Sequence, residues 1–173
     1  MGETMSRNLS GYSLTLAMAL AGVTSIVQAA DLAIAKQADN EQIERGRYMV
    51  KTGHCNNCHT AGFANSEGQM PEEKWLLGSG AQGWRGPWGT TYASNLRINV
   101  HAMSETQWVD YVKSMKTRPP MPFWSTAATT PQDLAAMYKY IKQLGSAGEP
   151  GRQYLPPDQE PKPPFIQYPM PVK

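Results

Sequence analysis

The segment Cys55-Asn56-Asn57-Cys58-His59 constrains this chain more than any other feature of its sequence. The Cys-x-x-Cys-His pattern is the signature of covalent haem c attachment. Two thiols at this spacing can each bond one vinyl group of the same porphyrin, and the adjacent imidazole can then reach the iron. We therefore expect Cys55 and Cys58 to hold one haem c and His59 to ligate its iron.

Three other uses of the two cysteines are open: a zinc site, a redox dithiol and a plain disulfide. Zinc needs about four ligands, and besides Cys55 and Cys58 the chain has only His54, His59 and His101, with no second ligand pair at zinc spacing. A redox dithiol is typical of a βαβ context, which the sequence does not show. A disulfide would not require the histidine that follows the second cysteine. Haem attachment is therefore the favoured interpretation.

Residues 1–30 have the layout of a secretory signal peptide, with Arg7 near the amino terminus, an apolar stretch over residues 14–27 and a small-residue cleavage site at Ala29 or Ala30. The apolar stretch is about 14 residues long, shorter than the roughly 20 that a membrane-spanning helix needs. An uncleaved membrane anchor is the alternative. Because haem c attachment in bacteria requires export, we expect a periplasmic protein without an integral membrane span after cleavage.

The rest of the chain is long enough for one domain, which we expect over residues 31–148, followed by an extended proline-rich tail over residues 149–173. The charge is nearly balanced, with 16 Lys and Arg against 14 Asp and Glu. No basic stripe indicates nucleic-acid binding. The sequence shows no Ser/His/Asp set, phosphate loop or carboxylate pair that would indicate an enzyme.

Helical patterns dominate the domain, and no segment shows strong strand alternation. A first helix is expected to begin at Asp39 or Asn40 and to end at Thr52, before Gly53. Gly46 inside this helix suggests a close helix crossing, because glycine costs about 1 kcal/mol relative to alanine in a helix. A tolerated glycine is the plainer alternative.

Three further helices are predicted after the haem motif. One begins after Ser104, whose capping box is completed by Gln107. The last begins after Thr130, carries an apolar stripe and ends at Gly145. A short helix is predicted over residues 72–77.

A glycine-rich segment over residues 78–99 carries Trp84, Trp88 and Tyr92. Aromatic side chains of this kind could form a wall of the haem site, and we expect the haem propionates near Arg85, Asn95 or Arg97. An ordinary surface loop over the core is the alternative.

Met121 is the best candidate for the sixth iron ligand, because it lies between prolines in Arg118-Pro119-Pro120-Met121-Pro122 and loses little entropy when it presents its thioether. His101 would instead give bis-histidine ligation. The other methionines fall on expected helix faces or in loops (Met49, Met70, Met103, Met115, Met137 and Met170).

Four pieces of the chain, in this order, resemble class I cytochromes c: Gly46, the haem motif, Met121-Pro122, and a last helix with Tyr138 and Tyr140. They cover roughly residues 40–145. The segment from Gly86 to Leu96, with Met121-Pro122, is most similar to the monohaem modules of bacterial periplasmic dehydrogenase cytochrome c subunits.

The resemblance implies an all-α class I cytochrome c fold in which the first and last helices cross near Gly46. It also implies single-electron transfer between periplasmic redox proteins, such as a dehydrogenase, an oxidase or another cytochrome. His59 and Met121 would leave the iron six-coordinate, and the thioether would raise its reduction potential. Two alternatives are open: a haem subunit of a dehydrogenase or oxidase complex, and a gas sensor or peroxidase-like enzyme if Met121 dissociates.

Overall fold

The computed structural model describes the backbone of residues 12–170 and the side chains of residues 28–170. It divides into two compact units, residues 1–41 and 42–173. In the first unit the residues from 28 to 41 are helical and exposed. Arg7 of the expected signal peptide lies outside the described residues.

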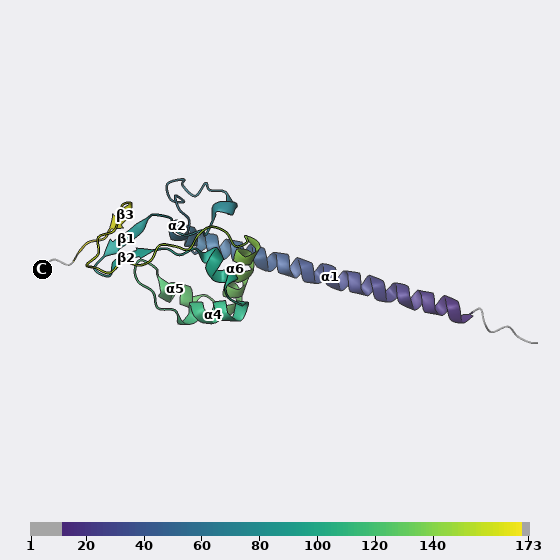
Figure 1. Cartoon of the computed structure of the whole chain (residues 1–173). Helices are drawn as coiled ribbons and strands as arrows, with labels where there is room; N and C mark the ends of the chain where they lie inside the picture. The colour runs from purple at the N-terminus through teal and green to yellow at the C-terminus, as the bar shows by residue number, and fades with distance from the viewer. Residues whose placement is uncertain (1–11, 171–173) are drawn as a thin grey trace, which may run out of the picture. The chain divides into compact units, whose positions relative to one another are not determined.

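Helix α1 runs without a break over Tyr12–Thr52 (Figure 1). The predicted start at Asp39 or Asn40 is therefore wrong. The residues before it do not interrupt a helix: residues 28–38 include five alanines, the strongest helix former, and neither glycine nor proline. The predicted end at Thr52 is confirmed.

The second unit contains the remaining elements, and its helices are short. They are α2 (Cys55–His59), the 3₁₀ turn η1 (Glu72–Lys74), α3 (Leu96–His101), α4 (Glu105–Ser114), α5 (Phe123–Ala128) and α6 (Pro131–Gln143). The capping box of Ser104 and Gln107 and the cap by Thr130 are confirmed. The short helix predicted over residues 72–77 is only the η1 turn.

Helices α1 and α6 cross at Gly46, as the sequence predicted. A Cβ atom at this position would collide with the backbone carbonyl of Ala136 and would lie 2.9 Å from the Cβ atom of Tyr140. The absence of a side chain thus lets the two backbones approach. The buried core around this crossing consists of Val50, Trp75, Leu76, Val100, Trp108, Val112, Leu134, Met137, Tyr140 and Ile141.

A small sheet, which the sequence did not predict, completes the fold. Its strands are β1 (Gly83–Gly86), β2 (Gly89–Tyr92) and β3 (Phe165–Gln167), in the order β2-β1-β3. Strands β1 and β2 form an antiparallel hairpin, and β3 pairs with β1 in parallel. Strands of three or four residues that contain glycine are too short to show a clear alternating pattern.

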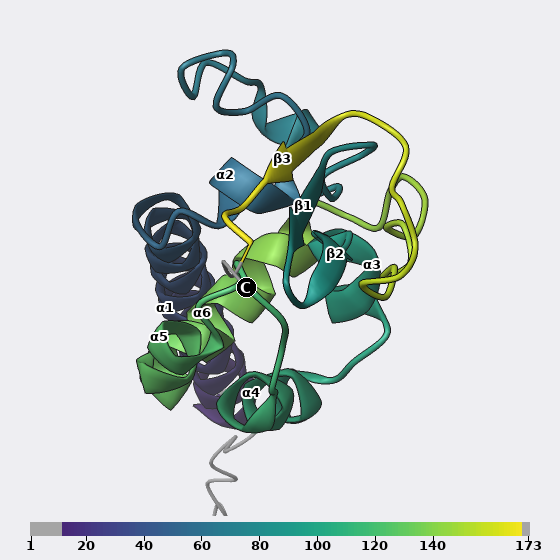
Figure 2. The same cartoon turned by 90° about the vertical axis from the view of Figure 1, so that its left-hand side faces the viewer.

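The proline-rich tail lies along the domain, and β3 belongs to it (Figure 2). Leu155 exchanges two backbone hydrogen bonds with Thr90 of β2, at 2.7 and 3.0 Å. A Cβ atom at Gly89, where φ is +98°, would lie 2.9 Å from the ring of Tyr154. The hairpin and the tail therefore approach each other as closely as a glycine permits.

Candidate haem site

Helix α2 places Cys55, Cys58 and His59 on a little more than one helical turn. Between α1 and α2 the chain turns at His54, which has a left-handed φ of 58° and is exposed. Both cysteines are free thiols and are half-buried, whereas His59 is buried. The three residues of the haem motif are thus brought together as the sequence predicted.

The imidazole of His59 is fixed by a backbone carbonyl. Its Nδ1 atom lies 2.8 Å from the carbonyl oxygen of Ser94. Because a carbonyl can only accept, Nδ1 carries the proton and Nε2 keeps its lone pair for a metal. The sequence does not indicate which residue accepts this bond, because a backbone acceptor carries no side-chain signature.

Polar contacts on both sides of His59 hold the helix and the carbonyl in place. The buried hydroxyl of Thr60 donates to Asn56 Oδ1 at 2.7 Å and accepts from the Leu76 amide at 2.8 Å. On the other side, Ser79 accepts from the amide of Ala93 through its hydroxyl at 3.2 Å and donates its own amide to the Ala93 carbonyl at 3.1 Å. These hydrogen bonds fix the positions of α2 and of the segment around Ser94, and so fix the distance between the His59 imidazole and the Ser94 carbonyl.

Burial controls the protonation of the site. It lowers the pKa of His59, against the opposing effect of the bond to Ser94, so the imidazole is neutral, which is the form that binds a metal. Burial raises the pKa of Cys55 to about 11 and also raises the pKa of Cys58. A reactive redox dithiol has a lowered thiol pKa, so this environment does not favour that use.

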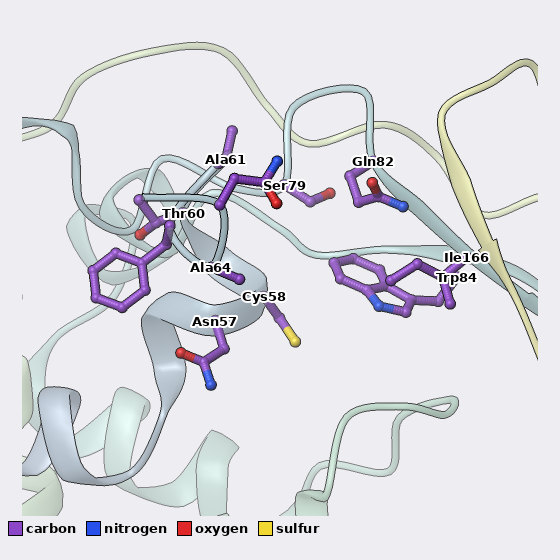
Figure 3. Close-up of a pocket in the computed structure, with 12 residues that line it drawn as sticks. Asn57, Cys58, Thr60, Ala61, Ala64, Ser79, Gln82, Trp84 and Ile166 are labelled. Carbon is purple, nitrogen blue, oxygen red and sulfur yellow. The ribbon is translucent and has the colours of Figure 1, made fainter. Parts of the chain in front are cut away.

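A pocket of about 130 Å³ lies beside Cys58. Cys58, Trp84 of β1 and Ile166 of β3 all line it (Figure 3). Among the aromatic residues expected to form a wall, Trp84 is therefore next to the motif. Trp88 instead packs edge-on against Tyr168, with ring centroids 5.2 Å apart. The tail contributes to the pocket, which the sequence did not indicate.

The side chains expected near the propionates are engaged elsewhere. The Arg97 guanidinium donates to the carbonyls of Glu73, Leu144 and Gly145. Asn95 caps α3 through its Oδ1 atom and donates Nδ2 to two carbonyls of the tail segment. Arg85 binds the tail at Gln159 and Glu160. All three side chains make bonds within the protein that stabilise the fold, and their place near a haem propionate stays a prediction.

Other polar atoms are buried without a protein partner in the part of the chain that the structure describes. They are the Nδ2 atom of Asn56, the indole nitrogen of Trp88 and the hydroxyls of Thr90, Thr91 and Thr117. Buried polar atoms nearly always have a hydrogen-bond partner. The unpaired groups of the hairpin (Trp88, Thr90 and Thr91) and of Thr117 are therefore available to a polar group of a bound cofactor.

Met121 is half-buried in the segment between α4 and α5, where its carbonyl accepts from the amide of Phe123 at 2.9 Å. Met137 is a buried core residue and Met170 is 54% exposed. The other candidate methionines pack against the core (Met49, Met70, Met103 and Met115). His101 bonds through Nδ1 to the Arg97 carbonyl at 2.8 Å.

The cytochrome c family model matches residues 43–145. The helix-rich fold with its small sheet is a class I cytochrome c fold. The chain therefore belongs to the cytochrome c family, whose members are electron-transfer proteins that bind haem c covalently. No curated protein and no solved structure matches the chain significantly.

Two further observations concern a membrane span and a metal site. Within residues 12–170, no helix has both the length and the apolar character needed to cross a membrane. In that same range, no three His, Cys, Asp or Glu side chains gather as they would around a metal ion. The donor set of two thiols and one imidazole fits covalently bound haem c.

Proposed function

We propose that the protein is a periplasmic single-electron carrier with one haem c, bound through Cys55 and Cys58 and ligated by His59 and Met121. One observation carries the proposal: the thiols and the imidazole lie together on α2, and the bond to Ser94 leaves Nε2 of His59 available. Bound haem c would supply an iron that accepts and releases one electron.

Met121 is the residue that best suits the sixth position. Prolines on both sides restrict its backbone, whereas the other described methionines are core residues or lie in the tail. With a histidine and a thioether as ligands, no position would be open for oxygen or substrate. This supports electron transfer over gas sensing or peroxidase chemistry.

The haem propionates would accept hydrogen bonds from the unpaired donors on the hairpin and before Met121. The indole of Trp88 and the hydroxyls of Thr91 and Thr117 are buried and have no partner among the described residues. A bound carboxylate would satisfy these groups, whose desolvation costs about 1–3 kcal/mol each when they are left unpaired.

Export would place the protein where haem c is attached. Residues 1–30 have the pattern of a cleaved signal peptide, and the residues from 28 to 41 make up an exposed helical segment. The partners would be other periplasmic redox proteins. Because the segment from Gly86 to Leu96 resembles the haem modules of dehydrogenase subunits, a subunit of such a complex is the second candidate.

Expression of the full chain in a bacterium with haem c maturation tests the proposal. The periplasmic fraction should contain the protein with covalent haem, shortened at its amino terminus, and it should undergo reversible one-electron reduction. The oxidised protein should show the far-red absorption band of methionine-ligated haem. Protein that is exported in full yet carries no covalent haem would contradict the assignment. Co-purification with a dehydrogenase would favour the second candidate.

A further inference from the structure

The chain after α6, which includes the proline-rich tail, is attached to the N-cap of α3 and to the hairpin. At α3, Nδ2 of Asn95 donates to the carbonyls of Ala147 and Glu149 at 2.8 and 3.2 Å. Leu155 pairs with Thr90, and β3 pairs with β1. The tail is therefore a fixed part of the domain, in contrast to a flexible extension.

Midway along the tail, Tyr154 contacts two separate parts of the domain. Its hydroxyl donates to the carbonyl of Trp88 at 2.8 Å, which binds it to the hairpin. Its ring lies under the guanidinium of Arg118, whose carbon atom is 3.7 Å from the ring centroid. This distance is short for a cation–π contact, which extends to about 6 Å. Tyr154 thus joins the hairpin to the segment that carries Met121.

Arg118 is close enough in sequence to Met121 to affect its position. Only Pro119 and Pro120 separate the two residues. Because the proline rings fix φ in the residues between them, the chain from Arg118 to Met121 has few free dihedrals. An arginine held on Tyr154 therefore limits where the methionine can lie.

Helix α5, which follows the Met121 segment, is held by two lysines from the end of α4 and just after it. Nζ of Lys113 donates to the carbonyls of Ala127 and Thr129, at 2.8 and 2.5 Å, at the end of α5. Lys116 lies over the ring of Phe123, 5.1 Å from its centroid. The Met121 segment is thus held by α4 on one side and by the tail on the other.

We propose that the proline-rich tail is a strap that positions the sixth iron ligand, with Tyr154 and Arg118 as its positioning residues. This proposal rests on the proposed function, in which Met121 binds the iron. Loss of the contact leaves the thioether able to bind but raises the fraction of time that it is dissociated. External ligands that compete with Met121 should then bind more tightly.

Imidazole binding to the oxidised holo-protein measures this fraction, because imidazole can bind only when Met121 dissociates. Tyr154→Leu and Arg118→Gln should each tighten imidazole binding by about two- to fivefold, the effect expected for a cation–π contact at an exposed arginine. The double variant should show no more than Tyr154→Leu alone, since both substitutions remove the same contact between the ring and the guanidinium. Tyr154→Phe keeps the ring and should stay closer to the wild type.

Arg152→Gln is the matched control. Arg152 is a cation of the tail that lies over the ring of Tyr92 in β2, 5.8 Å from its centroid, and it does not belong to the Met121 segment. Its imidazole affinity should equal that of the wild type. If the tail only stabilises the fold, Tyr154→Leu should lower the denaturant midpoint and leave the imidazole affinity unchanged. That result would overturn the proposal. Independent, multiplying effects of the two single variants would also overturn it.

Met121→Ala separates this outcome from failure of the proposed function. If Met121 is the ligand, this variant loses the far-red band and binds imidazole far more tightly than any tail variant. If the band and the affinity are unchanged in Met121→Ala, the ligand assignment itself is wrong, and the strap proposal falls with it. If they change while Tyr154→Leu and Arg118→Gln match the wild type, only the strap proposal is overturned.

Discussion

The Nδ1 atom of His59 donates a 2.8 Å hydrogen bond to the carbonyl oxygen of Ser94, 35 residues further along the chain. This bond selects the tautomer in which Nε2 keeps its lone pair, and it would make the imidazole a stronger electron donor to a bound metal. Ser94 directly precedes Asn95, which caps α3 and binds the start of the tail. The orientation of the His59 imidazole therefore depends on the side chain of Asn95, which does not touch it.

Asn95→Ala should destabilise the holo-protein by about 1–3 kcal/mol, because it leaves a buried helix end and two carbonyls without their partner. The reduction potential should rise, since a displaced Ser94 carbonyl would weaken the bond to His59. Denaturant unfolding and voltammetry measure the two effects. Asn99→Ala is the control, as Asn99 makes a single bond to the Ser94 hydroxyl at 3.1 Å. Equal losses in both variants would contradict the special role of Asn95.

Cys55→Ala and Cys58→Ala should each strongly reduce covalent haem and leave a largely unfolded chain. A small helical domain loses a large apolar core element together with its cofactor. Haem-stained gels of periplasmic extracts, with immunoblots for the amount of protein, decide the question. His54→Ala is the control, because His54 adjoins the motif and is exposed. Full staining in both cysteine variants would refute haem attachment.

The haem motif could be predicted because its chemistry lies in neighbouring residues, which one turn of helix necessarily brings together. The crossing at Gly46 could be predicted because a glycine inside a helix is costly unless a neighbour needs the space. Both predictions depend on residue types within a few positions, and the resemblance to class I cytochromes c named the last helix as the partner in the crossing. The helix caps at Ser104 and Thr130 could be predicted for the same reason, because the capping residues lie within three positions of one another.

Partners that are far apart in the sequence could not be predicted, and most of the differences between expectation and structure have this cause. The acceptor for His59 is a backbone carbonyl, which every residue possesses. Arg97 has the chemistry to bind a propionate, but the structure uses it at the end of α6. The proline content of the tail indicated an extended chain and not the strand pairing of β3. The early start of α1 has a different, local cause, because helix propensity continues on the amino-terminal side of the possible cap at Asp39 or Asn40.

Met121→Ala should retain covalent haem, lower the reduction potential and allow carbon monoxide to bind the reduced iron. The thioether stabilises the reduced state, so its loss favours the oxidised state. Voltammetry and carbon monoxide titration test both effects in one preparation. Met170→Ala is the control, because Met170 is 54% exposed in the tail. An unchanged potential without gas binding would point to His101 or to another methionine.

Acid should destabilise the protein partly through Glu72. Burial raises the pKa of this carboxyl, but hydrogen bonds from Arg47 at 2.5 Å and Tyr140 at 2.9 Å outweigh it and lower the pKa. The folded state therefore binds the proton less readily than the unfolded state. The stabilisation is complete above the unfolded pKa of about 4.3 and is lost as the pH falls through the lower folded value.

Glu72→Gln should remove this part of the pH dependence. The Glu72 side chain is 33% exposed, so the contribution at neutral pH should be about 1 kcal/mol or less. Denaturant midpoints between about pH 3 and 7 should fall less steeply in the variant than in the wild type. Glu73→Gln, at the exposed neighbouring position, should retain the wild-type slope. A wild-type slope in Glu72→Gln would show that the contacts with Arg47 and Tyr140 do not stabilise the fold.

Substitutions at Gly46 should weaken the crossing of α1 and α6. Even the single Cβ atom of Gly46→Ala would meet the Ala136 carbonyl, a backbone atom that cannot rotate away, and would crowd Tyr140. We expect a loss of about 1–3 kcal/mol from overpacking, partly offset by the better helix propensity of alanine, and a larger loss for Gly46→Val. Glu44→Val places the same β-branched side chain at an exposed site of α1 and should cost only about 0.5 kcal/mol. Denaturant melts followed at the haem absorption band compare the variants, and a Gly46→Ala protein more stable than the wild type would show that the two backbones are not in contact.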